Sequence, residues 1–124
     1  MTDGSVKVKR IVCAVDCGMV VNPDTIEAQI QGGTFFGLTA VLYGAITLKD
    51  GRVEQSNFDN YMPMRIDEAP VVETYIVESA EAPGGLGEAP TAAVGAAVTN
   101  AIFAATGKRI RTLPIDTELL KSSA

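Results

Sequence analysis

The sequence predicts an α+β fold, with a mixed sheet of about four or five strands and two main helices packed on it. Three observations support this prediction. Residues 23–43 and 91–106 have the end signals and the apolar content of two helices. Residues 6–16 and 71–78 are rich in β-branched side chains, as strands are. Residues 45–56 contain an Asp-Gly pair between two short segments, which is typical of a hairpin.

Length and composition favour a single domain over residues 1–124. The chain is 47% hydrophobic and has a net charge of −5 without a basic stripe, which argues against nucleic acid and membrane surfaces as partners. It has no uninterrupted run of eighteen apolar residues, and its first residues lack the basic and apolar regions of a secretory signal. We therefore expect no membrane segment in this chain and a location in the cytoplasm or the periplasm.

The two cysteines do not indicate a metal site. Cys13 and Cys17 are the only cysteines and the chain has no histidine, so it cannot assemble a four-ligand zinc site from soft ligands. We expect buried free thiols. An intrachain disulfide is the poorly supported alternative.

The first strand and the first helix are marked by their end signals. The strand over residues 6–16 ends before Gly18. Asn22 is a good N-cap and Pro23 suits the first helical position, so we predict a helix from Pro23 to about Tyr43.

The interior of this helix contains Gly32, Gly33 and Gly37. Each glycine costs roughly 1 kcal/mol relative to alanine within a helix, so some contact must offset the loss. Gln29, Gly33 and Gly37 share one helix face, which suits close approach to another backbone or to a flat ligand. From these residues alone, tight packing against a strand is the favoured interpretation.

The second half of the chain begins with the safest local prediction. Residues 45–48 and 53–56 pair through Lys49-Asp50-Gly51-Arg52, because Asp-Gly supplies the positive φ angles of a tight turn. Residues 57–70 predict a long connection, and such connections are often functional. Residues 111–115 are a candidate for a last short strand.

The second helix, residues 91–106, is alanine-rich and apolar on most faces, which predicts that it is largely buried. Gly107 is a good residue for the position after its end. Lys108 and Arg109 complement the negative end of the helix dipole.

The glycine loop, residues 79–90, is the most informative segment, and its second part reads Pro83-Gly84-Gly85-Leu86-Gly87-Glu88-Ala89-Pro90. Glycines permit positive φ angles and let a bulky ligand approach the backbone, while the helix start offers free N–H groups. Glu88 is therefore placed where a cofactor, a substrate and a base could meet. The structural alternative is an ordinary turn in which Glu88 stabilises the helix dipole by roughly 0.3–1 kcal/mol.

Three motifs together resemble a known family. They are Val12-Cys13-Ala14-Val15-Asp16-Cys17-Gly18, Asn22-Pro23-Asp24-Thr25-Ile26-Glu27-Ala28-Gln29-Ile30-Gln31-Gly32-Gly33 and Gly84-Gly85-Leu86-Gly87-Glu88. In this order they resemble the C-terminal end of the large, molybdopterin-binding subunit of molybdenum hydroxylases. This is the xanthine dehydrogenase and aldehyde oxidoreductase family, and the resemblance, over about residues 6–115, is strongest to the bacterial isoquinoline 1-oxidoreductase type.

The resemblance implies roles for individual residues. Glu88 matches the family's general base, which takes a proton from the molybdenum-bound hydroxide as that oxygen attacks an electrophilic carbon. Gln29 matches a glutamine of a Gln-x-x-Gly stretch that hydrogen-bonds the pterin, and Gly33 on the same face is expected to face the cofactor. A loop that passes close to the molybdenum centre is matched by Gly84, Gly85 and Gly87.

The resemblance also implies cofactors and partners. Molybdenum would be held on molybdopterin cytosine dinucleotide by the sulfurs of the pterin, so this chain would supply no metal ligand. Electrons would pass through iron–sulfur clusters in a small partner subunit. The substrate would be an N-heteroaromatic compound or an aldehyde, hydroxylated with oxygen from water.

Two features depart from the family pattern. The usual Gly-Glu-Pro is replaced by Glu88-Ala89-Pro90, which predicts a helix start shifted by one residue. A complete molybdenum subunit is several times longer than this chain. We therefore expect the chain to be the C-terminal portion of a cofactor-binding domain, either a split-off subunit or an excised piece, that needs the remainder of the subunit and is inactive alone.

Two other functions are weighed against this one. The chain could be a non-catalytic structural or assembly module that completes the fold of a partner subunit, with its glycines serving only packing. A nucleotide-binding domain is disfavoured, because the glycines do not follow G-x-G-x-x-G, no P-loop Lys-Ser/Thr follows, and Glu88 would repel a phosphate.

Overall fold

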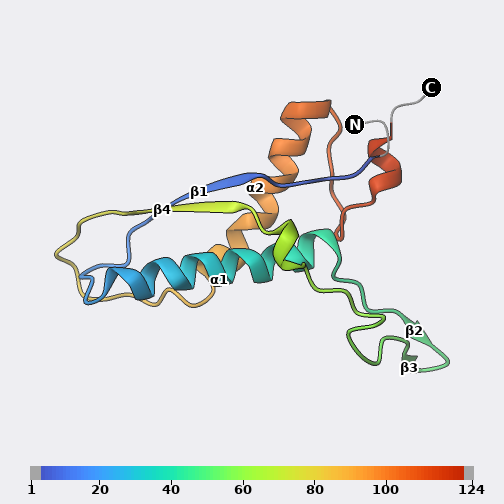
Figure 1. The fold of residues 1–124 in the computed structure, drawn as a ribbon, viewed down its shortest axis with the longest axis horizontal. Helices are drawn as coiled ribbons and strands as arrows, with labels where there is room; N and C mark the ends of the chain where they lie inside the picture. The colour runs from blue at the N-terminus through green and yellow to red at the C-terminus, as the bar shows by residue number, and fades with distance from the viewer. Residues whose placement is uncertain (1–3, 122–124) are drawn as a thin grey trace.

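The computed structural model describes residues 4–121 of the chain. Its elements in chain order are β1 (Arg10–Val15), α1 (Pro23–Leu42), β2 (Leu48–Lys49), β3 (Arg52–Val53), the 3₁₀ turn η1 (Ile66–Glu68), β4 (Val71–Ile76), α2 (Ala89–Thr106) and the 3₁₀ turn η2 (Thr117–Leu120). Strands β1 and β4 run side by side along α1, α2 crosses α1, and the β2–β3 hairpin projects from one end (Figure 1).

The α+β class and the two main helices are confirmed, but the single mixed sheet is wrong. Among residues 4–121, the four strands form two separate two-stranded sheets. Strand β1 pairs with β4 in parallel, from Arg10 opposite Val71 to Val15 opposite Ile76. The β2–β3 hairpin is antiparallel and stands apart from that pair, because its strands are only two residues long and project away from the helices (Figure 1).

The last predicted strand, residues 111–115, does not form. Its final residue Ile115 is buried, and its N–H donates to the carbonyl of Val41 at 2.9 Å. The segment is thus tied to the end of α1 rather than to a sheet edge. Ile115 fills part of the core without strand pairing, while Leu113 is 49% exposed.

Helix α1 begins and ends where the end signals predict. The Asn22 side chain accepts hydrogen bonds from the N–H groups of Asp24 and Thr25, and Pro23 occupies the first turn. Tyr43 follows the last helical residue, and its N–H donates to the carbonyl of Thr39. The N-cap satisfies donors that have no partner within the helix.

The glycine face of α1 packs against α2, so the predicted close contact forms with a helix and not with a strand. A Cβ on Gly33 would lie 2.5 Å from Pro90 Cγ, and a Cβ on Gly37 would lie 2.5 Å from Val94 Cγ1. The Thr91 hydroxyl donates to the Gly33 carbonyl at 2.9 Å. These contacts offset the helix cost of the glycines, because any side chain here would hold the two helices apart.

Helix α2 starts at Ala89, two residues before its predicted start, and ends at the left-handed Gly107 as predicted. The prediction that it is largely buried is wrong within the described chain. One stripe is buried, and it consists of Pro90, Val94, Val98 and Ile102. The other faces carry mainly alanines exposed to solvent, because within residues 4–121 the helix is covered only by α1, by residues 6–11 and by the segment that returns along residues 110–120.

The length and composition of α2 also match a membrane-spanning helix, with a mean hydropathy of 1.2 and 22% of its residues buried. A core helix of a water-soluble protein can have the same length and apolar composition. In this chain its buried stripe contacts α1.

Two apolar clusters make up the core. The larger joins the last half of α1 to α2 and the C-terminal segment, and consists of Leu38, Val41, Val94, Val98, Ile102, Ile110, Ile115 and Leu120. The smaller lies between the β1–β4 pair and the first half of α1, and consists of Cys17, Ile30 and Leu86. Both cysteines are free thiols, and Cys17 is buried while Cys13 is half-buried.

Tyr43 and Glu68 join the end of α1 to η1. The Tyr43 hydroxyl donates to one Glu68 carboxylate oxygen, and the Arg65 N–H donates to the other at 2.7 Å. Burial, followed by the hydrogen bond to Glu68, raises the pKa of Tyr43 to about 12. The hydrogen bonds from Tyr43 and from the Arg65 backbone lower the pKa of Glu68.

We expect the contact between Tyr43 and Glu68 to stabilise the fold at neutral pH and to do so less at both extremes. A lowered pKa for Glu68 in the folded chain means that its contribution is lost as the pH falls through that value. A raised pKa for Tyr43 means that its contribution is lost as the pH rises toward about 12. Urea unfolding of Tyr43→Phe and the parent chain should differ most near neutral pH. A difference that stays constant down to strongly acidic pH would contradict this account.

Two glycine substitutions on α1 should change stability in opposite directions. Gly37→Ala places a Cβ 2.5 Å from Val94 Cγ1 and 2.8 Å from the Thr91 carbonyl oxygen, and the latter is backbone that cannot turn away. We expect it to lower the free energy of unfolding by about 1–3 kcal/mol. Gly32→Ala meets nothing within 4 Å and should raise it by about 0.5–1 kcal/mol. Denaturant titration measures both, and equal effects would remove the helix contact as the reason for Gly37.

Candidate functional site

The glycine loop follows the carboxyl end of β4 and lies against the turn that follows β1. The Met19 N–H donates to the Glu81 carbonyl at 2.9 Å, and the Gly84 N–H donates to the Cys17 carbonyl at 2.8 Å. Because β1 and β4 are parallel, both segments leave the sheet at the same end of its strands. The carboxyl ends of parallel strands are a usual place for ligand sites in α/β proteins.

The turn after β1 accepts only glycine at Gly18. This residue has a φ of 72°, and a Cβ here would lie 2.2 Å from the Ala82 carbonyl oxygen. Its N–H also donates to the Asp16 carboxylate at 3.0 Å. From the sequence, Gly18 is only the end of a strand, and its role in seating the glycine loop is not detectable without knowing that residues 18 and 82 meet.

The loop glycines do not adopt the positive φ angles that glycine permits. Positive φ occurs at four glycines of residues 4–121, and none of them is Gly84, Gly85 or Gly87. A Cβ on Gly84 would make an ordinary contact, 3.7 Å from the Cys17 carbonyl oxygen, and a Cβ on Gly85 or Gly87 would meet nothing within 4 Å. Neither conformation nor packing within this chain requires glycine at 85 and 87, and the space beside both is open to a group from outside the chain.

Leu86 anchors the middle of the loop. It is 9% exposed and packs with Cys17 and Ile30 in the smaller core cluster. Because Leu86 points inward, its neighbours Gly85 and Gly87 are both held at the surface. The loop therefore presents bare backbone on either side of a fixed apolar anchor.

Glu88 immediately precedes α2, at the N-cap position, with φ −115° and ψ −15°. Its carbonyl accepts the Ala92 N–H at 3.1 Å, but its side chain makes no capping hydrogen bond. The residue is exposed, and its carboxylate has no partner among residues 4–121. The helix continues through Ala89 and Pro90, so the insertion of Ala89 between Glu88 and Pro90 leaves Glu88 directly before the first helical residue.

Gln29 lies on α1 and is exposed, with no hydrogen-bond partner among the residues described. It stands one turn before Gly33 on the same face. Gly33 in turn contacts Pro90, which is two residues after Glu88. The α1–α2 contact thus brings Gly33 to the helix end that carries Glu88, and Gln29 lies one turn away from this contact.

The space beside the Gly33 Cα is already filled by another residue of this chain. Pro90 fills the space where a side chain would stand, so the structure gives this glycine a packing role. Its contact with a cofactor stays a prediction. Gln29, one turn earlier, makes no hydrogen bond to any described side chain, so its side chain is less constrained than Gly33 by contacts within this chain.

A cavity of about 230 Å³ lies between the glycine loop and the start of α1. Its lining is mostly apolar and consists of Cys17, Met19, Val20, Val21, Asn22, Thr25, Ile26, Pro83 and Gly84. Within residues 4–121, no group of three or more His, Cys, Asp or Glu side chains could hold a metal ion. A metal at this site would therefore need ligands from a cofactor or from another part of a larger protein, and the open glycine backbone and the unpartnered carboxylate fit such a group.

A family comparison decides what this geometry belongs to. The molybdopterin cofactor-binding domain family matches residues 1–70 of the chain. The chain belongs to this family. The match extends through the first strand, α1 and the hairpin, and thus includes Gln29 and Gly33, while the glycine loop lies beyond it.

Individual relatives extend the similarity across nearly the whole chain. Isoquinoline 1-oxidoreductase subunit beta of Brevundimonas diminuta is 34% identical over 92% of this chain and 15% of its own length. The xanthine dehydrogenase molybdenum-binding subunit of Escherichia coli O157:H7 is 34% identical over 89% of this chain and 16% of its own length. The chain thus corresponds to a fragment of the molybdopterin-binding subunit of the xanthine dehydrogenase family.

A solved structure shows the same fold. Quinoline 2-oxidoreductase from Pseudomonas putida 86 superimposes with a TM-score of 0.82 at 24% identity, over 91% of this chain and 16% of that chain. The chain therefore spans about a seventh of the length of the proteins that it matches.

Proposed function

We propose that this chain forms one wall of the molybdenum cofactor site of a hydroxylase, and that Glu88 is the general base. The single observation that supports this most is the unpartnered Glu88 carboxylate beside Gly85 and Gly87, two glycines that nothing inside the chain requires. The family supplies the identity of the group that would approach them, because its members bind molybdopterin.

The cofactor, in our proposal, is molybdopterin cytosine dinucleotide carrying molybdenum. When bound, it supplies the oxygen-transfer and two-electron redox chemistry of hydroxylation. Gln29 would donate or accept a hydrogen bond at the pterin, and the backbone of Gly84, Gly85 and Gly87 would allow close approach. The electrons would leave through iron–sulfur clusters of a small partner subunit.

Glu88 would accept a proton at its carboxylate during the reaction. A general base must lie within hydrogen-bond reach of the proton that it takes, and a site closed to water can adjust its pKa. In this chain Glu88 is exposed, so closure of the site would have to come from the remainder of the molybdenum subunit. The substrate class that the relatives' names favour is an N-heteroaromatic ring, with aldehydes as the other candidate.

The alternative is a structural or assembly module that completes a partner's fold and takes no part in catalysis. Gly33 and Gly37 favour it, because helix packing alone explains both. Molybdenum analysis separates the two proposals. We expect no stoichiometric molybdenum in the purified chain alone, and cofactor in its complex with the remainder of the subunit that is sensitive to substitutions in the glycine loop.

Replacing Glu88 tests the proposed base. Glu88→Gln keeps the size of the side chain and removes the proton acceptor, so turnover of the complete enzyme should fall by at least about 10²-fold. Molybdenum and pterin content should stay unchanged, because the carboxylate makes no hydrogen bond that supports the loop. Glu81→Gln is the matched control, since that side chain is also exposed but precedes the glycines. Near-normal turnover of Glu88→Gln at saturating substrate would refute the assignment.

Replacing Gly85 tests the proposed approach of the cofactor. Gly85→Val has room for its side chain within this chain, so the unfolding transition of the isolated chain should hardly move. The complete subunit should lose most of its cofactor, because the valine would occupy the space reserved for it. Gly33→Val is the contrasting variant, which should reduce stability by about 1–3 kcal/mol through its clash with Pro90. Full cofactor content in Gly85→Val would remove the loop from the site.

A further inference from the structure

We infer that Thr91 is a positioning residue. Its hydroxyl joins the helix start that carries Glu88 to the middle of α1, and it thereby holds the Glu88 carboxylate at a fixed place relative to Gln29. The inference rests on the proposed function, because it concerns the placement of the proposed base.

The Thr91 hydroxyl donates its hydrogen bond across the crossing of the two helices. Its Oγ1 lies 2.9 Å from the Gly33 carbonyl oxygen, and the two partners are 58 positions apart in the sequence. Among residues 4–121, this is the single hydrogen bond between α1 and α2. Because a hydrogen bond has a preferred length and direction, it fixes how the start of α2 sits on α1.

The other two threonines of α2 use their hydroxyls within their own helix. Thr99 and Thr106 each donate to the carbonyl four residues earlier, at 3.0 and 2.7 Å. This is a common bond for threonine inside a helix. For Thr91, the residue four positions earlier is Gly87, which lies before the helix begins. The hydroxyl of Thr91 is therefore left to bond a partner outside its own helix.

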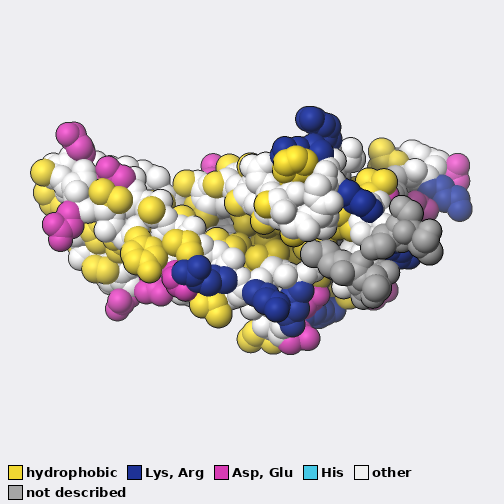
Figure 2. Space-filling model, turned by 90° about the horizontal axis from the view of Figure 1, so that it is seen from above, with side chains coloured by type: hydrophobic (Ala, Val, Ile, Leu, Met, Phe, Trp, Pro, Cys, Tyr) yellow, Lys and Arg dark blue, Asp and Glu magenta, His cyan; other side chains and the backbone are white. Residues whose placement is uncertain are grey.

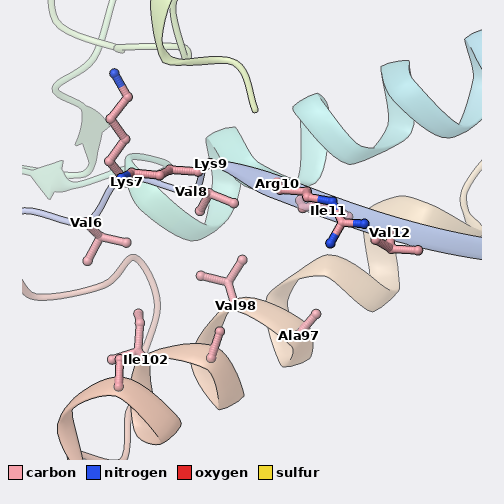
Figure 3. Close-up of a pocket in the computed structure, with 12 residues that line it drawn as sticks. Val6, Lys7, Val8, Lys9, Arg10, Ile11, Val12, Ala97, Val98 and Ile102 are labelled. Carbon is pink, nitrogen blue, oxygen red and sulfur yellow. The ribbon is translucent and has the colours of Figure 1, made fainter. Parts of the chain in front are cut away.

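Further along, α2 contacts its neighbours through apolar side chains. Figure 3 shows Val98 and Ile102 facing Val6 and Val8 of the segment that leads into β1. Seen from above, hydrophobic side chains line a hollow in the middle of the molecule, and charged side chains stand on its rims (Figure 2). The hydrophobic effect has no preferred direction, so these contacts hold α2 in place without fixing the exact position of its first residues.

The bond connects the backbones that carry both predicted site residues. Thr91 stands three residues after Glu88, whose carbonyl accepts the Ala92 N–H at 3.1 Å, so the first turn of α2 orders the Glu88 backbone. At the other end of the bond, Gly33 stands one turn after Gln29 on α1. Loss of the hydroxyl would therefore loosen the proposed base relative to the helix that carries the proposed pterin contact.

Gly33 also makes room for this bond. A Cβ on Gly33 would lie 3.3 Å from Thr91 Oγ1 and 2.5 Å from Pro90 Cγ, so it would press on the hydroxyl as well as on the proline ring. A general base acts only within hydrogen-bond reach of the proton that it takes. A misplacement of about 1 Å can cost on the order of 10²-fold in rate.

Thr91→Val tests the positioning role, because valine has nearly the shape of threonine and lacks the hydroxyl. The complete enzyme is offered isoquinoline, quinoline and benzaldehyde with a dye as electron acceptor, and turnover per bound molybdenum is measured with the compound that the parent oxidises fastest. We expect kcat to fall on the order of tenfold, with KM and molybdenum content little changed.

Two further variants serve as controls. Thr91→Ser keeps a hydroxyl donor and should bring kcat back to within about twofold of the parent. Thr99→Val removes a hydroxyl that bonds within its own helix, two turns further from Glu88, and should leave kcat at the parent value.

A double variant shows whether Thr91 acts through Glu88. In the Glu88→Gln background, Thr91→Val should change kcat by less than about twofold, because the carboxylate that it positions is gone. A purely structural effect of Thr91→Val on the subunit would multiply with the effect of Glu88→Gln instead.

Amide hydrogen exchange provides a readout that does not depend on activity. Peptides from the start of α2 are followed in the complete subunit. Thr91→Val should speed exchange of the Ala92 N–H, which bonds the Glu88 carbonyl, by about threefold or more. Thr91→Ser and Thr99→Val should leave it unchanged.

Any one of four outcomes would overturn the inference. They are a parent-like kcat in Thr91→Val, no recovery in Thr91→Ser, an equal loss in the Glu88→Gln background, and loss of molybdenum in step with activity. Unchanged exchange at Ala92 would remove the hydrogen bond as the cause. A parent-like Thr91→Val beside a slow Glu88→Gln refutes only the positioning role, whereas a parent-like Glu88→Gln refutes the proposed function.

Discussion

The contact between the glycine face of α1 and the first two turns of α2 fixes the position of everything else in the site. A Cβ at Gly33 or Gly37 would come within 2.5 Å of Pro90 or Val94, so the helices can cross this closely only because those two positions lack side chains. The contact sets where α2 begins and hence where Glu88 stands. It also sets the direction of α2, and the segment that follows returns to α1 through the bond from Ile115 to Val41.

A second constraint acts from the other side of the glycine loop. The parallel pairing of β1 with β4 brings the carboxyl ends of both strands to the same end of the sheet. Two backbone hydrogen bonds then join Cys17 and Met19 to the loop. The loop is therefore held at its beginning by the turn after β1 and at its end by the helix contact. Between these two attachments, Leu86 is buried, and the bare backbone around it faces outward.

Local signals in the sequence were sufficient for the helices and the hairpin. Asn22 caps α1, Gly107 ends α2, and the Asp50-Gly51 turn has the two positive φ angles that its residues favour. These features depend on a few neighbouring residues, so they can be predicted without knowledge of the fold. Pairing between distant segments is different, since nothing near residues 111–115 shows that they bond to the end of α1 instead of a sheet edge.

The same limit applies to the site. The sequence and its family resemblance indicate Glu88 and the loop glycines, and the structure places Glu88 without a partner at the start of a helix. The sequence does not predict that Pro90 covers Gly33 or that Gly18 holds the loop against Ala82. Both facts depend on contacts between segments about sixty residues apart. The predicted burial of α2 is too high for a related reason. An apolar composition indicates that a helix surface can be buried, but it does not indicate which part of a protein buries it.

The glycines of this chain fall into two groups, and the difference is informative about function. Gly18 and Gly107 have positive φ, while Gly37 lies against another helix, so the fold of the chain itself requires glycine at these positions. Gly85 and Gly87 have neither a special conformation nor a neighbour. A glycine loses more conformational entropy on folding than any other residue, so two of them in an anchored loop are a cost that must be offset elsewhere. The described part of the chain offers no such benefit, and this observation supports our proposal that a group from outside the chain approaches the loop beside the Glu88 carboxylate.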